Sequence, residues 1–463
     1  MENTLEQARF NDKRLFFDAG HTRSYEFRIA QLRKLQSLLE ELADEINKAL
    51  YEDLHKSPME AFMTETSVIQ AELRHSLKNL KSWMKPERQS VPLALEPSSC
   101  SIQYDPKGVV LIIAPWNYPV MLSLSPLIGA IAAGNTVILK PSEEAPASAK
   151  VLEKIIKQCF EPDYVSVVQG LGHEVVPKLM EDHTFNHIFF TGSTAVGRII
   201  ARQASEKLTS TTLELGGKSP AVVDKSADLE VSAKRIVWGK LMNAGQTCVS
   251  PDYLLVEESI KEEIVHELIK AIESSYGAAP ETSEDYPRMI NEKQFDRVSE
   301  YLNNGRILYG GKTIRETRYI QPTLLDQVDM DSSIMKEEIF GPILPILSFR
   351  SNDEIRRIIH KNRYPLACYY FGKDGERENL VMNQTEFGGG CVNNTIVHLG
   401  NPDLPFGGVQ YSGSGQYHGW HGFECFSHKK SIVKTGTWID PPMKYAPFTE
   451  SKFKFLRNIL KLG

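Results

Sequence analysis

Apolar residues in the first part of the chain recur at the spacing of an amphipathic helix. Between residues 24 and 84 they follow one another at steps of three and four, with charged residues between them: Ile29, Leu32, Leu35, Leu39, Leu42, Ile46 and Leu50. This period puts them on one face, which predicts a helical layer packed on the domain that follows. Pro86 and Pro92 interrupt the pattern, and residues 99–106 are predicted to form a short strand.

After residue 106 the pattern changes to short apolar runs separated by helix-length segments. The runs are rich in β-branched residues and lie at 109–114, 136–140, 164–170 and 187–192. Strands that alternate with helices are typical of a doubly wound α/β unit around a parallel sheet.

A second series of the same kind follows the first. It starts with a strand at 221–223, continues with a helix over 228–242 and a strand at 253–258, and includes the apolar stretch 337–349. With 463 residues the chain is too long for a single core, so two α/β domains are expected.

One uncharged stretch, from Val109 to Leu139, is long enough to suggest a membrane span. However, prolines and asparagines divide it into a β-rich run, a helix-length piece at 119–134 and another β-rich run. Strands of a parallel sheet covered on both faces are apolar throughout, so strand, buried helix and strand is the favoured interpretation, and no transmembrane span is expected.

Charge and cysteine content exclude several classes of function. The net charge of −6 and the sequence pI near 6.1 give no reason to expect a nucleic-acid partner. The six cysteines form no CxxC pair and have no metal-ligand spacing, so neither a disulfide framework nor a metal site is expected. The polar N-terminus has no features of a signal peptide, and a cytoplasmic location is expected.

The chain ends on a basic segment, residues 452–463, with apolar residues at helical steps. Such a helix could make weak peripheral contact with a membrane surface. Packing on the protein or on a second subunit is the favoured alternative, because one short amphipathic helix binds lipid weakly.

Two residues stand out as candidates for covalent chemistry. Cys248 lies in GQTCVSP, a polar turn between a predicted helix and a predicted strand, whereas a structural cysteine would prefer the strand. Glu214, in LELGG, is flanked by leucines, and an apolar setting would raise the pKa of its carboxyl toward that of a general base. Taken alone, Cys248 could be a small buried apolar residue and Glu214 a solvated strand end.

Other candidates follow predicted strands. Asn117, in PWNYP, offers an amide donor where open α/β sheets bind ligands, although it could simply cap the next helix. The segment FTGSTAVGR (190–198) reads GxxxxG, an atypical glycine turn that can still receive a pyrophosphate at a helix N-terminus. Lys140 and Glu143 could bind ribose hydroxyls, or PSE could merely begin a helix.

Together these motifs identify a family. The chain resembles the aldehyde dehydrogenase superfamily, specifically its class 3 branch of fatty and aromatic aldehyde dehydrogenases, from about residue 10 to beyond residue 430. The motifs that carry the resemblance are APWNYP (114–119), LKPSE (139–143), FTGSTAVG (190–197), TLELGGKSP (212–220), GQTCVSPDY (245–253), EEIFGP (337–342) and LPFGG (404–408). The beginning of the chain close to the helical layer and FSHKKS (426–431) favour class 3.

The resemblance implies a role for each motif residue. Cys248 would be the nucleophile, Glu214 the general base, and Asn117 an oxyanion donor together with the backbone N–H of Cys248. The cofactor would be NAD or NADP, and the reaction the oxidation of a medium- or long-chain aliphatic or aromatic aldehyde to the acid through a thioester. The residues expected to bind the cofactor are Trp116, Lys140, Glu143, Gly192, Ser193, Val196, Glu338 and Phe340.

The resemblance also implies the domain organisation. A Rossmann-like NAD(P)-binding domain would cover 1–211, with the helical layer at 10–84 and a strand segment for oligomerisation at about 90–106. A second, catalytic α/β domain would cover 212–412, and a C-terminal return and small oligomerisation arm 413–463. Class 3 relatives are dimers, and a homodimer is expected by analogy.

The chain departs from class 3 in two places. Gln410 and Tyr411 stand in GVQYSG where GVGxSG is usual, and Trp420 and His421 stand in YHGWHGF where YHGKxSF is usual. Both departures lie near the expected substrate mouth or arm. The chain lacks the long apolar anchor that ends the class 3 membrane forms, which predicts a soluble enzyme.

Three other functions can be set against this one. A CoA-acylating dehydrogenase would dispense with the water-activating carboxylate, whereas Glu214 is present. A thiol hydrolase would pair Cys248 with a distant histidine such as His398 or His418 and would need no nicotinamide. A catalytically silent scaffold would not need Cys248, Glu214 and Asn117 intact.

Overall fold

The computed structural model describes residues 9–459 and begins with the predicted helical layer. The apolar positions of the layer are buried, and Leu32, Leu35, Ile46 and Leu50 are fully so. One π-helical segment, Phe62–Thr66, interrupts the layer near its middle. Its helices are α2 (Phe10–Asp18), α3 (Tyr25–Glu41), α4 (Ala43–Leu54), α5 (Pro58–Ala61) and α6 (Ser67–Trp83).

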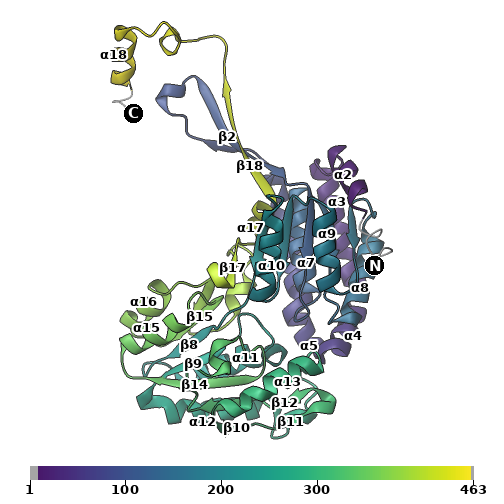
Figure 1. Ribbon diagram of the computed structural model, residues 1–463, viewed down its shortest axis with the longest axis vertical. Coiled ribbons are helices and arrows are strands. Elements are labelled where there is room, and N and C mark those ends of the chain that lie inside the picture. Colours follow the sequence, from purple (N-terminus) through teal and green to yellow (C-terminus); the bar gives the residue numbers. More distant parts are fainter. Residues whose placement is uncertain (1–8, 460–463) are drawn as a thin grey trace.

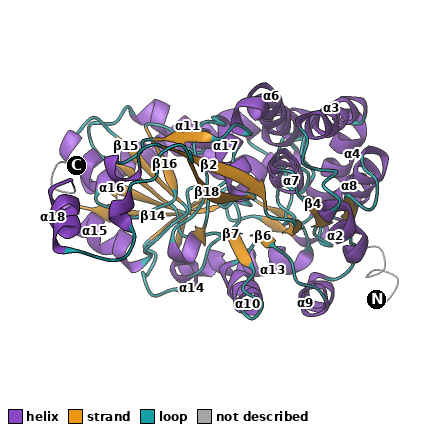
Figure 2. Cartoon of the chain, turned by 90° about the horizontal axis from the view of Figure 1, so that it is seen from above, coloured by secondary structure: helices purple, strands orange, loops and turns teal. Residues whose placement is uncertain are grey.

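A six-stranded sheet with the order β17-β7-β6-β3-β4-β5 forms the first α/β unit. Its strands β7, β6 and β4 are labelled in Figure 2. All its strands are parallel except the short β17, which pairs antiparallel with β7. The strands are β3 (Val109–Ile113), β4 (Thr136–Lys140), β5 (Val165–Val167), β6 (His187–Thr191), β7 (Ser210–Glu214) and β17 (Gly413–Ser414). The helices are α7 (Met121–Ala133), α8 (Pro146–Cys159), α9 (Gly172–Asp182) and α10 (Thr194–Ser205).

Strand β3 shows why its sequence is apolar throughout. Val110 and Ile112 pack in one core cluster with residues of α7 and α8, whereas Val109 and Leu111 pack in another with residues of α9 and α10. Successive side chains of a strand point to opposite faces, and both faces are covered here. The uncharged stretch 109–139 is therefore strand, helix and strand, as predicted. No helix in residues 9–459 is long and apolar enough to cross a membrane.

A seven-stranded sheet with the order β10-β13-β14-β9-β8-β15-β16 forms the second unit. Its strands are β8 (Pro220–Val223), β9 (Tyr253–Glu257), β10 (Arg306–Tyr309), β13 (Thr323–Asp326), β14 (Ile343–Phe349), β15 (Ala367–Phe371) and β16 (Gly389–Val392), beside a separate pair β11 (Thr313–Ile314) and β12 (Tyr319–Ile320). The helices of this part are α11 (Leu229–Leu241), α12 (Lys261–Tyr276), α13 (Glu292–Glu300), α14 (Ser333–Lys336), α15 (Asn352–Lys361) and α16 (Gly375–Asn383).

An arm projects from the body of the molecule (Figure 1). It is a three-stranded antiparallel sheet in which β2 (Ser98–Pro106) lies between β1 (Glu87–Gln89) and β18 (Ser427–Thr435). Helix α17 (Gly419–Cys425) leads into β18, and α18 (Glu450–Ile459) lies beyond the arm, away from both α/β units (Figure 1). Residues 460–463 of the predicted basic segment lie outside the described residues.

Candidate active site

Three neighbouring strands of the six-stranded sheet end at the same edge. β3, β6 and β7 are adjacent and parallel, and the chain leaves each of them at its carboxyl end. In open α/β sheets this edge forms the ligand crevice. Four of the predicted residues follow β3 and β6 directly, and Glu214 is the last residue of β7. The four are Trp116, Asn117, Gly192 and Ser193.

Cys248 reaches this edge from the other α/β unit. It lies on a turn between α11 and β9, as its polar neighbours in the sequence predicted. Gly245 fixes the path of this turn, because it has a φ of 76° and a Cβ there would collide with the backbone oxygen of Gly341. The GQTC and EEIFGP motifs are thus packed directly against each other.

A polar cavity of about 300 Å³ lies between the two units and brings most of the predicted residues together. It is also lined by Arg297 and Gln294, which the sequence analysis did not single out. The predicted residues that line it are Trp116, Asn117, Gly192, Ser193, Glu214, Cys248, Glu338 and Phe340.

Two carboxyl groups in this cavity have oxygens without partners. Both oxygens of Glu214 and Oε1 of Glu338 are buried without a hydrogen bond among the described residues. Burial raises the pKa of Glu214 well above 4.5, as predicted from its leucine neighbours. Burial, followed by the charge of Asp252, raises the pKa of Glu338 to about 8. A cavity with unpartnered carboxyls is suited to bind polar groups of a ligand.

Glu338 is held close to the backbone of the LELGG motif. A Cβ at Gly216 would collide with the carboxyl of Glu338, which would have to move to make room for it. The neighbouring Phe340 packs edge-on against Trp116, with ring centroids 5.2 Å apart. The segment 337–342 therefore faces the loop after β3 across the cavity.

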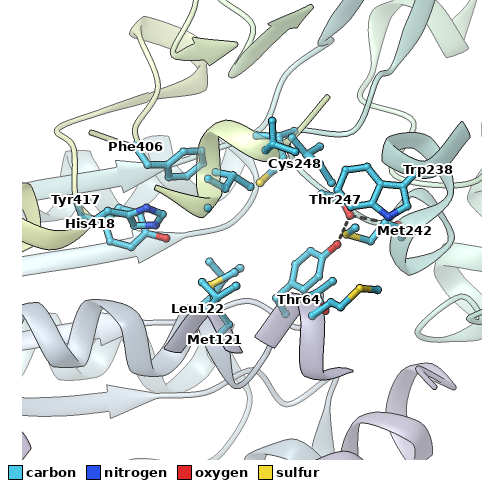
Figure 3. A pocket seen from close by; sticks show the side chains of 18 residues that line it. Thr64, Met121, Leu122, Trp238, Met242, Thr247, Cys248, Phe406, Tyr417 and His418 are labelled. Carbon is cyan, nitrogen blue, oxygen red and sulfur yellow. Dashed lines mark hydrogen bonds between the residues drawn. The ribbon is translucent and has the colours of Figure 1, made fainter. Parts of the chain in front are cut away.

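An apolar cavity of about 250 Å³ adjoins the polar one. Cys248 and Leu122 line both cavities, so the thiol lies where the two meet. Met121 and Leu122 lie on one side, Trp238 and Met242 on another, and Phe406, Tyr417 and His418 on a third (Figure 3). None of the residues that line this cavity is a lysine, arginine, aspartate or glutamate.

The surroundings of Cys248 disfavour the thiolate form. Burial, and then the nearby carboxyls of Glu338 and Glu214, raise the pKa of Cys248 well above 9. The backbone N–H groups of Cys248 and Val249 act in the opposite direction. Its activation as a nucleophile therefore requires a proton acceptor or a nearby positive charge.

Asn117 is held by contacts on both sides. Its Nδ2 donates to the backbone oxygen of Gln246 at 3.1 Å, two residues before Cys248. Its backbone oxygen accepts from Lys56 Nζ at 2.9 Å and from Asn243 Nδ2 at 2.8 Å. The side-chain amide therefore lies beside the turn that carries the thiol. The alternative role of a helix cap is not observed, because α7 begins at Met121 without a side-chain cap.

Lys140, Glu143 and Val196 do not line the polar cavity. Lys140 is the last residue of β4, next to β3, and its Nζ lies 2.9 Å from Glu143 Oε2. Glu143 also accepts from the backbone N–H of Gly172 at 2.6 Å, and these bonds lower the pKa of its partly buried carboxyl. Ser193 caps α10 by accepting from the N–H of Val196, and the segment lies between β6 and α10 in the predicted strand–turn–helix arrangement.

Two buried networks in the site were not predicted. Lys218 pairs with Asp252, whose Oδ1 accepts from the N–H of Ile339 at 3.0 Å and so fixes the segment that carries Glu338 and Phe340. Both residues lie in the motifs GGKSP and SPDY, so the motifs could have indicated them. The second network, around Lys56, lies in a segment for which the helical pattern gives no signal.

The two segments whose sequences depart from the class 3 pattern lie outside both cavities. Tyr411 is beside α10, where its backbone oxygen accepts from Thr194 Oγ1 at 3.0 Å and its ring lies below the guanidinium of Arg198. Trp420 packs against Trp83 and Tyr104 near the base of the arm. Neither lines the cavities at Cys248.

The thiol hydrolase considered as an alternative would need a histidine hydrogen-bonded to Cys248, and neither His398 nor His418 makes such a bond in the described part of the chain. His418 lines the apolar cavity, and His398 contacts Cys391, with 3.4 Å between Nδ1 and Sγ. Within residues 9–459 no hydrogen bond joins either imidazole to Cys248. Burial lowers the pKa of both histidines to about 4.

A family model described as the aldehyde dehydrogenase family matches residues 13–432. This chain belongs to the aldehyde dehydrogenase family. It is an NAD(P)-dependent aldehyde dehydrogenase with the mixed α/β fold of that family, which confirms the fold class and the activity predicted from the motifs.

The comparisons also confirm the class 3 resemblance. The chain is 44% identical over 461 residues to 4,4'-diaponeurosporen-aldehyde dehydrogenase of Staphylococcus aureus, covering 99% of this chain and 100% of that protein. It is 42% identical to rat aldehyde dehydrogenase family 3 member B1, covering 96% of each. A solved structure, the substrate-bound state of Staphylococcus aureus AldH, superposes with a TM-score of 0.96 at 44% identity, covering 98% of this chain and 99% of that one.

Proposed function

We propose that this aldehyde dehydrogenase oxidises an apolar aldehyde through a covalent thioester on Cys248. The observation that carries the proposal is the position of this thiol between two unlike cavities. One cavity has unpartnered carboxyl oxygens, and the other is apolar and could hold the body of an aldehyde.

The first step adds the sulfur of Cys248 to the aldehyde carbon. The S–C bond forms, the C=O π bond opens, and the thiol proton passes from the sulfur to a water molecule and on to bulk solvent. The oxygen that becomes negative would be stabilised by Asn117 Nδ2 and the backbone N–H of Cys248, because fixed donors stabilise charge that develops in the transition state. In this structure Asn117 Nδ2 already lies beside the loop of Cys248, 3.1 Å from the oxygen of Gln246.

The polar cavity, together with residues outside it at the end of β4 and on α10, offers groups for a dinucleotide. The capping Ser193 and Gly192 would face a pyrophosphate, while Lys140 and Glu143 would bind a ribose and Val196 would line the cofactor path on α10. Glu338, with an unpartnered Oε1, would bind the second ribose, and Phe340 and Trp116 would flank the ring. When bound, the cofactor supplies a two-electron acceptor for the hydride of the substrate carbon.

Glu214 would then release the product. Its carboxylate accepts a proton from water, the water oxygen bonds to the thioester carbon, and the C–S bond breaks to give the acid and the thiol. A carboxyl that is buried without partners is suited to this role, since a raised pKa makes its carboxylate a stronger base. The presence of Glu214 in the cavity favours hydrolysis over transfer of the acyl group to CoA.

The apolar cavity supports a medium- or long-chain aliphatic or an aromatic aldehyde as substrate. Its walls have no charged side chain, so a charged substrate would lose its hydration without compensation. The name of the Staphylococcus aureus relative refers to an aldehyde of diaponeurosporene.

We propose a homodimer in the cytoplasm, assembled through the arm of β1, β2 and β18. β18 has exposed residues along most of its length, including Val433 at 54%, and Trp438 just beyond it is 77% exposed. A projecting sheet with apolar side chains of this kind is typical of an interface. All six cysteines are free, which fits a reducing compartment. The proposed domain limits remain 1–211, 212–412 and 413–463.

Intact-protein mass spectrometry tests the proposed mechanism. An apolar aldehyde mixed with enzyme and NAD should give a transient mass increase equal to the acyl group, located on the peptide that contains Cys248. Cys248→Ala should bind NAD normally and acquire no acyl group, whereas Cys159→Ala should behave as the wild type because Cys159 is buried in α8, outside both cavities. Turnover in Cys248→Ala would refute the proposal.

A further inference from the structure

A third cavity, of about 200 Å³, adjoins the apolar cavity on the side away from the polar one. The two share five lining residues, Met63, Val68, Leu399, Gly400 and His418, and the third cavity shares none with the polar cavity. In contrast to the apolar cavity, it contains a carboxyl, that of Glu72, and it is also lined by the hydroxyls of Ser67 and Ser125. We call this third cavity the polar annex. Through the shared lining residues it extends the proposed substrate space beyond the apolar cavity.

Ser125 in the annex has a buried hydroxyl without a partner. It lies on α7, is 3% exposed, and its Oγ makes no hydrogen bond within residues 9–459. A helical serine commonly bonds back to the carbonyl four residues earlier. Ser123, on the same helix, does so with Pro119 at 2.7 Å, whereas Ser125 does not. A buried hydroxyl left unsatisfied is costly, so this group is available to a ligand.

Glu72 provides the second polar group. It lies on α6 and is 6% exposed, and the one hydrogen bond found for its carboxyl comes from the backbone N–H of Gly419 to Oε1, at 2.7 Å. No cation pairs with this carboxyl among the described ion pairs of the chain. Burial raises the pKa of Glu72 to about 7, so its second oxygen can accept or donate near neutral pH. Helices α6 and α7 thus present two incompletely bonded side chains to one small space.

From this arrangement we infer that the annex binds a hydroxyl group at the far end of the aldehyde substrate. The substrate hydroxyl donates a hydrogen bond to the free oxygen of Glu72 and accepts one from the hydroxyl of Ser125. The inference rests on the proposed function, since it gives the substrate that reacts at Cys248 a second polar end. The substrate class is an ω-hydroxy aldehyde whose apolar chain fills the cavity between the two ends. A primary ammonium fits less well, because a cation would have to lose its hydration while crossing apolar walls.

The terminal hydroxyl of the substrate should make the specificity of the enzyme depend on the length of the aldehyde chain. An aldehyde without a terminal hydroxyl leaves the buried Oγ of Ser125 unsatisfied, whereas a hydroxyl of the correct reach bonds both to Ser125 and to the free oxygen of Glu72. Each hydrogen bond of this kind is worth about a factor of 2–10 in binding, so two should give roughly 10-fold or more in kcat/KM. A chain that is too short or too long cannot reach, and the advantage should disappear.

The test compares ω-hydroxy aldehydes with unsubstituted aldehydes over a series of increasing chain length. The wild type should show a ratio of kcat/KM, hydroxy over plain, that peaks at one length at roughly 10-fold or more. Ser125→Ala and Glu72→Gln should each lower that peak at least 3-fold and leave kcat/KM for plain aldehydes nearly unchanged. Ser123→Ala should keep the full peak, because its hydroxyl lies on the same helix but outside the annex.

Three results would overturn the inference. A ratio near one at every length would do so, as would a peak that persists in both annex variants. If neither aldehyde series is oxidised by the wild type, the proposed function fails as well. Oxidation of plain aldehydes with a flat ratio refutes only the role of the annex, so the two failures are distinguishable.

Discussion

Lys56 donates to Glu65 Oε1 at 2.7 Å, and both side chains are completely buried. The same ammonium donates to the backbone oxygen of Asn117, while Glu65 Oε2 accepts from the N–H groups of Val120 and Met121. The pair thus connects the helical layer to the loop that carries the proposed oxyanion donor. The position of Asn117 depends on two residues more than 50 positions earlier in the chain.

Lys56→Met should destabilise the protein by about 3–5 kcal/mol, because it leaves Glu65 buried without its cation. Activity should also fall, since the backbone oxygen of Asn117 loses a donor. Urea unfolding measures the first effect and steady-state kinetics the second. The double variant Lys56→Met/Glu65→Leu should recover part of the stability, and equal loss in the single and double variants would contradict this account.

Asn117→Ala should lower kcat by about 10²–10³, the usual cost of removing one oxyanion donor. Binding of NAD, measured by fluorescence titration, should change little. The rate of Cys248 alkylation by iodoacetamide serves as control and should stay close to that of the wild type, because alkylation forms no oxyanion. A kcat within a factor of three of the wild type would remove Asn117 from the mechanism.

Glu214→Gln should retain a burst of NADH in rapid mixing while steady turnover collapses, because the thioester forms but is not hydrolysed. The wild type should show the matching pH dependence. Burial raises the pKa of Glu214, and the base must be ionised, so hydrolysis should decline as the pH falls through that raised value, at a pH well above 4.5. Loss of the burst in Glu214→Gln would mean that Glu214 acts before the thioester exists.

Glu143→Gln should shift cofactor preference toward NADP. The carboxyl of Glu143 is ionised, because its bonds to Gly172 and Lys140 lower its pKa, and an anion next to a ribose repels a 2′-phosphate. The ratio of kcat/KM for NADP over NAD should rise severalfold. Asp182→Asn, which removes a surface carboxyl at the end of α9, is the control and should leave the ratio unchanged. An unchanged ratio in Glu143→Gln would place the ribose elsewhere.

Much of the fold could be predicted from local patterns. The strand predicted at 136–140 has the same limits in β4, and that at 109–114 ends one residue earlier in β3, because buried parallel strands are continuous apolar runs. The helix predicted over 119–134 is α7, Met121–Ala133. Cys248, Glu214 and Asn117 could be singled out because motifs mark the ends of strands and helices.

Long-range contacts could not be predicted in the same way. Lys56 and Glu65 look like ordinary polar residues of a helical layer, and only the tertiary structure places them under the loop of Asn117. Arg297 enters the polar cavity from α13, outside every quoted motif. Likewise Ser125 and Glu72 meet because two helices cross, and periodicity does not indicate which buried polar groups remain unpaired.

The order of strands in the arm has a consequence for synthesis of the chain. β2 is flanked by β1 and β18, and the hydroxyl of Ser98 is hydrogen-bonded to that of Thr435, which lies 337 positions later in the chain. At about 5–20 residues per second, roughly 15–70 s pass at the ribosome before β18 can pair with β2. Throughout that interval one complete row of backbone donors and acceptors on β2 is open to neighbouring nascent chains. Aggregation of this enzyme during expression should therefore begin at residues 98–106.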